Sequence, residues 1–204
     1  HVFKTVKNIE LDTPFKKLTW SKAMDSYGSD KPDLRFELDL IDFKEYALKS
    51  SFKTFFEADA IKTIIASNAD LFTRKKIDNL TDIAKTYGAK GLAWFKVGDN
   101  ELSGGLSKFF DEDLALEMIE TLNLCENDIL FIVADSHKVA CTALGAIRIE
   151  IANHLNLIDI DVFKPVWITD FPMFDYDDMD QPTPMHHPFT APKINHITEL
   201  NLDQ

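Results

Sequence analysis

The chain has 204 residues, of which 45% are apolar, and it includes 16 Phe and 3 Trp. This composition is sufficient for a packed core and excludes intrinsic disorder, and no apolar run reaches the roughly 18 residues of a transmembrane helix. The net charge of −12 is uneven, because residues 1–36 carry +2, residues 37–165 carry −8 and residues 166–204 carry −6. An acidic chain repels phosphate backbones, so contact with nucleic acid must be local or must use basic surface outside this chain.

The two cysteines and the start of the chain indicate the compartment. Cys125 and Cys141 lie in apolar surroundings without metal-like spacing, which favours buried free thiols over a disulfide. The first residues lack the charged-then-apolar pattern of a secretion signal. We therefore expect a cytoplasmic protein with no membrane contact.

The first forty residues predict short elements around a charged turn. Residues 17–20 favour a strand, and Ser21 is a candidate N-cap for a helix over residues 22–26 that ends at Gly28. The turn Tyr27–Arg35 then places four charges, a Gly and a Pro in nine residues. It is typical of a surface turn, although it could also be a rigid connector whose cations, Lys31 and Arg35, touch a phosphate or a carboxylate.

The remaining elements follow from periodicity and capping residues. Alternation of apolar and acidic residues predicts a strand over 36–40 with one side facing solvent. Thr73, Asp111 and Ser136 are candidate N-caps of helices over residues 74–87, 113–122 and 137–155. Further elements are a helix over 43–49, one or two strands within 52–66, strands over 92–97, 106–110, 128–134 and 166–169, and a mostly irregular remainder.

Two segments repeat the order helix, short turn, apolar strand, and a strand precedes each helix. The order βαββαβ predicts an α+β fold, a two-layer α/β sandwich of the split βαβ or ferredoxin-like type with both helices on one face of the sheet. We assign this domain to residues 37–162. The flanks, 1–36 and 163–204, lack the periodicity for a core of their own, so their strands should pack together or against a partner.

Two candidate ligand sites lie near the end of the chain. His186 and His187 are adjacent, so on an extended segment their side chains point in opposite directions and cannot easily share a metal. They are either surface histidines or donors to a small anionic ligand or ATP. The acidic stretch 174–181 fails the EF-hand pattern, because the positions that need Gly and Glu hold Asp180 and His186. The sequence therefore predicts no metal site.

Five blocks in order carry a family resemblance: SKAMDSYGSDKPDLRF, KTYGAKGLAWFKV, ALGAIRIEIANHLNL, VWITDFPMF and MHHPFTAPK. Together they resemble bacterial-type aspartyl-tRNA synthetases of class IIb. The resemblance implies that residues 37–162 are the GAD domain, which this family inserts in its catalytic domain, and that residues 1–36 and 163–204 are flanking pieces with strands of that catalytic domain. It also implies a connector at Tyr27–Arg35, with Asp30, Lys31 and Arg35 docking one domain on the other near the active-site side.

For the whole enzyme, the resemblance implies the substrates L-aspartate, ATP and tRNA, with Mg²⁺, and a homodimer. His186 would lie beside aspartate and its adenylate, with His187 as a weaker candidate. The anticodon-binding OB-fold and the second and third class II signatures are missing from the chain, so we expect an inactive fragment with no catalytic residue and no bound cofactor. The alternatives are a non-catalytic GAD scaffold or tRNA-binding module of the tRNA-dependent amidotransferase type, which would not explain MHHPFT, and an acidic globular domain without a ligand.

Overall fold

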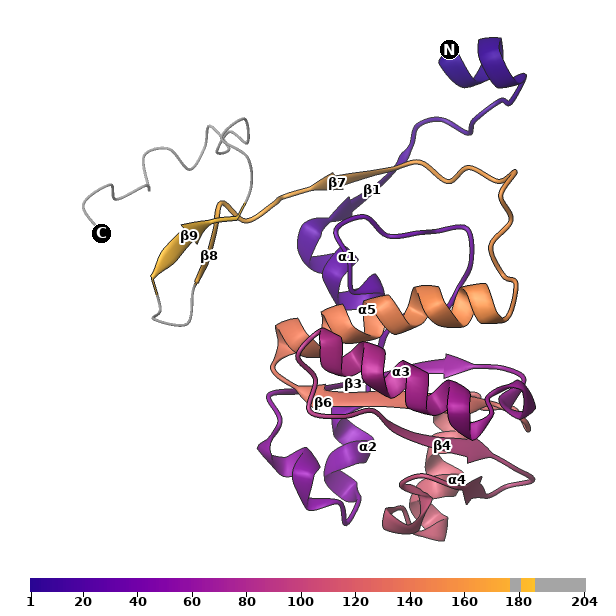
Figure 1. Ribbon diagram of the computed structural model, residues 1–204, viewed down its shortest axis with the longest axis vertical. Coiled ribbons are helices and arrows are strands. Elements are labelled where there is room, and N and C mark those ends of the chain that lie inside the picture. Colours follow the sequence, from indigo (N-terminus) through magenta and orange to yellow (C-terminus); the bar gives the residue numbers. More distant parts are fainter. Residues whose placement is uncertain (177–180, 186–204) are drawn as a thin grey trace.

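The computed structural model describes residues 1–176 and 181–185. Its main body is a five-stranded sheet in the order β2-β3-β6-β4-β5, with every neighbouring pair antiparallel (Figure 1). The strands are β2 (Ile41–Asp42), β3 (Ala60–Ala66), β4 (Ala93–Val97), β5 (Leu102–Ser103) and β6 (Ile129–Asp135). No helix within the described residues is both long enough and apolar enough to span a bilayer.

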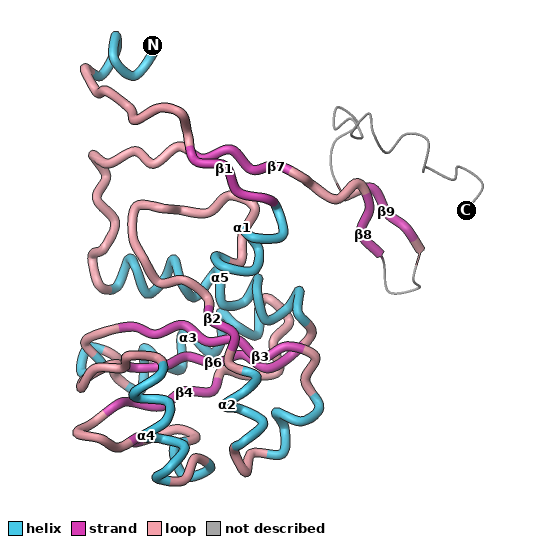
Figure 2. The backbone as a smooth tube through the Cα atoms, turned by 180° about the vertical axis from the view of Figure 1, so that it is seen from behind, coloured by secondary structure: helices cyan, strands magenta, loops and turns pink. Residues whose placement is uncertain are grey.

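Helices cover both faces of this sheet. Helices α3 (Arg74–Thr86) and α5 (His137–His154) lie on one face, and α2 (Lys44–Lys49) and α4 (Glu112–Thr121) lie on the other, as Figures 1 and 2 show from opposite sides. Each face has its own hydrophobic core. The predicted two-layer sandwich with both helices on one face is therefore wrong: the body has three layers, and the split βαβ topology is not confirmed.

The central strand β6 explains the third layer. Ile129, Phe131 and Val133 pack into the core under α3 and α5, whereas Leu130 and Ile132 pack into the core that contains α2 and α4. All five side chains are fully buried. A strand that is apolar on both sides needs cover on both sides, so a single layer of helices could not have satisfied it.

Three predicted helix starts are confirmed by their caps. The side chains of Thr73, Asp111 and Ser136 accept hydrogen bonds from the first-turn amides of α3, α4 and α5. The first α-helix, α1 (Trp20–Tyr27), ends at Gly28 as predicted, but it begins earlier. Its N-cap is Thr19, not Ser21, and Thr19 Oγ1 accepts from the amide of Lys22 at 3.2 Å.

Two predicted strands, over residues 36–40 and 106–110, were wrong. Residues 36–40 are irregular, and Leu38 has a positive φ of 87° that no regular strand contains. The expected strand over 106–110 is replaced by the 3₁₀ helix Ser107–Phe109. Residues 52–66 do contain one strand, β3, as predicted, and it follows a 3₁₀ helix, Lys53–Glu57. Residues expected to be irregular form a hairpin of β8 (Phe174–Tyr176) and β9 (Pro182–Pro184). Cys141 is a buried free thiol as expected, but Cys125 is exposed.

The two flanking segments meet outside this body. Strand β1 (Lys16–Thr19) pairs in parallel with β7 (Val166–Thr169), with Lys16 opposite Val166, which confirms that the flanks pair with each other. A helix at Phe3–Lys7 precedes them. Figure 1 shows that β1 and β7 lie beyond α5, on the side away from the five-stranded sheet. The body is therefore inserted between two neighbouring strands.

Candidate functional site

The junction between the N-terminal flank and the body is formed by α1, by residues 28–38 and by the part of α5 that contacts them. It begins where α1 meets α5. Gly28 ends α1 with a left-handed φ of +66°, and its backbone lies directly on that of Gly145. A Cβ at Gly28 would come within 2.1 Å of the carbonyl oxygen of Cys141, and a Cβ at Gly145 would come within 2.5 Å of the carbonyl oxygen of Gly28. Only glycine fits at either position, so the two helices are held at backbone contact.

The charges of the following turn are largely used within the junction. Asp33 accepts three hydrogen bonds from the Arg35 side chain, at 2.7 to 3.2 Å, and one from its backbone amide. This pairing lowers the pKa of Asp33 and raises that of Arg35. Arg35 Nη1 also donates to the carbonyl of Asp159, just beyond α5. Arg35 thus ties the turn to the exit from the body.

Arg148 on α5 is the centre of the junction, a role that was not predicted from the sequence. Arg148 is 1% exposed, and its guanidinium donates to the carbonyls of Asp33 and Leu38 at 2.9 Å, Phe36 at 3.0 Å and Glu37 at 3.3 Å. The segment 33–38 therefore wraps around one cation. This arrangement explains why residues 36–40 do not form a strand, since a side chain takes the carbonyls that a ladder would need.

Aromatic rings complete the enclosure of this cation. The Arg148 guanidinium lies 4.1 Å from the ring centre of Phe36 and 5.0 Å from that of Tyr27. Burial lowers the pKa of Arg148, with Asp39 and Asp33 opposing, and burial followed by the charge of Asp39 raises the pKa of Tyr27.

The sequence contains one indication that Arg148 is a buried cation with polar partners. Arg148 stands between Leu144 and Ile151 at helical spacing on the apolar face of its helix, where a charge needs buried partners.

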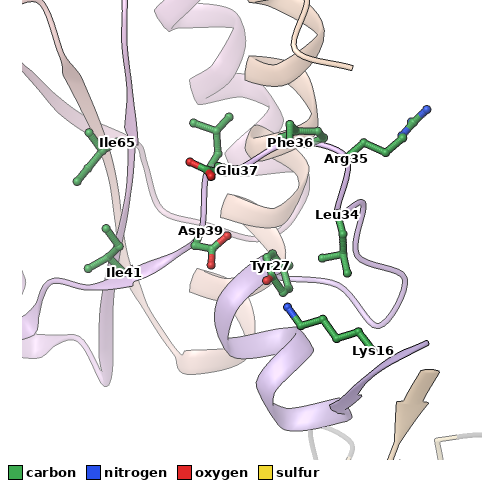
Figure 3. Close-up of a pocket in the computed structure, with 10 residues that line it drawn as sticks. Lys16, Tyr27, Leu34, Arg35, Phe36, Glu37, Asp39, Ile41 and Ile65 are labelled. Atoms are coloured by element: carbon green, nitrogen blue, oxygen red, sulfur yellow. The ribbon is translucent and has the colours of Figure 1, made fainter. Parts of the chain in front are cut away.

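A cavity of about 580 Å³ lies beside the junction and contains both signs of charge. Figure 3 shows the Lys16 ammonium directed toward Tyr27, with Glu37 and Asp39 on the opposite wall and Arg35 extending away. The cavity holds neither a nucleophile paired with a base nor a group of free cations that would suit a triphosphate. Within residues 1–176 and 181–185, the junction has the chemistry of a structural connection.

The sequence-predicted site residues are not brought together. Arg35 borders the 580 Å³ cavity, Lys31 borders one of about 250 Å³ under α5, and Asp30 borders one of about 540 Å³ between α1, α5 and β8. Lys31 contributes its backbone amide to Ser29 Oγ at 3.0 Å. His186 and His187 lie outside the described residues.

Comparisons with known proteins match both the body and the flanks. Residues 53–144 match the GAD domain family. Nearly the whole chain aligns with bacterial proteins: aspartate–tRNA ligase 2 of Streptococcus mutans (45% identity over 99% of this chain and 34% of the relative) and the aspartate–tRNA ligases of Staphylococcus saprophyticus (44%, 98% and 35%) and Macrococcus caseolyticus (41%, 100% and 35%). The chain thus spans about a third of the length of these curated relatives.

Proposed function

We propose that this chain acts as one third of a bacterial aspartate–tRNA ligase, because residues 53–144 match the GAD domain family and almost the whole chain aligns with about a third of such enzymes. The parent enzyme would join L-aspartate to tRNA through an aspartyl-adenylate, using ATP and Mg²⁺. The resemblance inferred from five sequence blocks is confirmed by these relatives. They give no support to the amidotransferase-type module.

The observation that carries the proposal is the pairing of β1 with β7. Two strands from opposite ends of the chain lie side by side and enclose the body between them, which is the geometry of a domain inserted into another domain. An isolated two-stranded parallel ladder is unusual, since parallel strands normally lie inside larger, covered sheets. Trp167 on β7 is 59% exposed, in keeping with a sheet that continues elsewhere. We therefore retain the boundaries 1–36, 37–162 and 163–204.

The arginines support our expectation that the chain alone does not activate aspartate. Adenylate formation depends on cations that stabilise the phosphates in the transition state. The chain has three arginines, and each has a partner: Arg35 with Asp33, Arg74 with Asp78, and Arg148 with the junction carbonyls. Each arginine is therefore already engaged, which supports our expectation that this chain by itself does not hold the phosphates of ATP.

We propose two roles for the predicted site residues. Arg35 connects the catalytic flank to the inserted domain through Asp33 and Asp159, and Asp30 and Lys31 belong to the same connector. His186, and more weakly His187, would face aspartate and its adenylate, a role that rests on the family resemblance. Partners of the parent enzyme would be tRNA, aspartate, ATP and a second copy, in the cytoplasm.

A segment exchange tests the proposal. The aligned third of the Streptococcus mutans enzyme is replaced by this chain, and aspartate-dependent exchange of pyrophosphate into ATP is measured. We expect the chimera to be active and the isolated chain to be inactive. A folded chimera without exchange would contradict the proposed function, and exchange by the isolated chain would contradict its inactivity.

The chimera also tests His186. His186→Ala should lower exchange by about ten- to a hundredfold, because a hydrogen bond to a charged ligand is worth about 1.5–3 kcal/mol. The melting temperature should stay within about 2 °C of the parent chimera. Unchanged exchange would remove His186 from the proposed site.

A further inference from the structure

A group of three potential metal ligands joins α1 to α5, away from the junction cation. Asp25 is on α1, and His137 and Cys141 are one turn apart on α5. One ligand atom from each lies within 4.8 Å of the others. The sequence did not reveal this group, because Asp25 is remote from α5 along the chain, and only the packing of α1 on α5 brings the three together (Figure 1).

The distances match the edges of a tetrahedron around zinc. Bonds of about 2.0–2.3 Å at a tetrahedral angle place a nitrogen and an oxygen ligand about 3.4 Å apart, and a nitrogen and a sulfur ligand about 3.6 Å apart. His137 Nε2 lies 3.4 Å from Asp25 Oδ1 and 3.7 Å from Cys141 Sγ. Two of the three edges therefore already have the required length.

The surroundings allow a fourth ligand. His137 and Cys141 line the cavity of about 540 Å³ between α1, α5 and β8, which has room for a water molecule. The His137 side chain is 53% exposed, so an ion can reach it from solvent. Three protein ligands and one open position is a known arrangement for zinc.

Lys62 carries a positive charge next to Asp25 and would repel a bound cation. Its ammonium is 2.5 Å from Asp25 Oδ1 and also donates to the Asp25 carbonyl, and Lys62 is 3% exposed. An ionised carboxylate oxygen has two lone pairs, so Asp25 Oδ1, which lies 3.4 Å from His137 Nε2, can accept from Lys62 and still face the cation. Ligating carboxylates commonly hold such an outer hydrogen bond.

The thiol also has to lose its proton for metal binding. Burial raises the pKa of Cys141 to about 11, while the charge of Lys62 opposes this rise. Without metal, Cys141 is therefore an unreactive thiol. When zinc binds, the sulfur–zinc bond replaces the S–H bond and the proton passes to the buffer, and Lys62 then lies near the new thiolate.

We propose that Asp25, His137 and Cys141 form a binding site for a zinc-class divalent cation, which connects the catalytic flank to the inserted domain. The metal ties α1 to α5 at the point where the chain enters the body. This site is independent of aspartate activation, since none of its residues belongs to the proposed aspartate site.

Cobalt(II) is the probe, because a cobalt–thiolate bond gives a near-ultraviolet charge-transfer band that oxygen and nitrogen ligands do not give. The 204-residue chain is titrated with cobalt chloride in the presence of a thiol-free reductant. We expect a saturable band at one cobalt per chain, d–d bands of tetrahedral coordination, release of one proton per metal, and loss of the band when zinc chloride is added. Absence of the band would overturn the proposal.

Matched variants test whether the cobalt–thiolate band comes from Cys141. Cys141→Ala should abolish it, and Cys125→Ala should leave it unchanged, because Cys125 is exposed and outside the group. His137→Ala, at an exposed side chain, should weaken cobalt affinity at least about tenfold without unfolding the chain. His186→Ala with His187→Ala should leave the band in place. A band that survives Cys141→Ala or disappears in folded Cys125→Ala would refute the site.

Discussion

Replacing Arg148 by methionine tests the central role of this residue in the junction. Arg148→Met keeps most of the aliphatic stem but removes every donor to the carbonyls of residues 33–38. Three of these carbonyls accept at 3.0 Å or less, those of Asp33, Phe36 and Leu38. The substitution therefore leaves a loop without the group around which it folds.

The change in the free energy of unfolding caused by Arg148→Met is the sum of opposing contributions. A buried polar group that loses its partner costs about 1–3 kcal/mol, and hydrogen bonds to charged donors are at the upper end of this range. Against this loss, removal of a buried cation recovers its desolvation cost, and water can reach part of the released loop. We expect a net loss of about 3 kcal/mol, which corresponds to a fall in melting temperature of roughly 6–12 °C for a domain of this size.

Two measurements report this effect. Urea and thermal unfolding, followed by circular dichroism, give the global change. Hydrogen exchange at the amide of Leu40, which donates to the Ser26 carbonyl at 2.8 Å, reports the local release of the junction. Arg148→Lys should lose most of the same stability, because the single nitrogen of an ammonium cannot reach all the carbonyls that the three nitrogens of the planar guanidinium bind.

Arg74→Met is the matched control. Arg74 is an exposed arginine that pairs with Asp78 on the surface of α3, so its replacement should change stability by no more than about 0.5 kcal/mol. If Arg148→Met is as mild as this control and exchange at Leu40 is unchanged, the junction does not depend on the guanidinium and our reasoning is wrong.

Three further predictions concern the junction and the charge of the chain. Gly28→Ala should destabilise the chain by at least about 2 kcal/mol, since its Cβ would overlap the Cys141 carbonyl at a positive φ, whereas Gly91→Ala, with open space around its Cβ, should be mild; equal melting temperatures would contradict the backbone contact. Because hydrogen bonds from Arg35 depress the folded pKa of Asp33, Asp33 contributes stability above its unfolded pKa and loses it as the pH falls through the folded value. The stability difference between the wild type and Asp33→Asn should therefore be largest at neutral pH and shrink in acid, and a pH-independent difference in urea titrations would refute this assignment. The isolated chain, at −12, should bind tRNA only weakly at ~0.15 M salt, and sub-micromolar, salt-sensitive binding in a filter assay would show a basic contact surface that we have not identified.

Local sequence signals determined the elements whose hydrogen bonds are local. The starts of α3, α4 and α5 were predictable, because Thr73, Asp111 and Ser136 cap amides only three residues away. The run of apolar residues in β6 correctly predicted a buried strand. The same run also required cover on both faces, a consequence that would have predicted three layers.

The junction and the proposed metal site were decided by tertiary structure alone. The pattern at 36–40 is that of a strand, but Arg148 is more than a hundred residues away and takes the carbonyls that would have formed a ladder. Likewise, Asp25 meets His137 and Cys141 only because two glycines allow α1 to lie directly on α5. Sequence spacing describes partners within a few turns, whereas these partners come together when the flanks pair and the body folds between them.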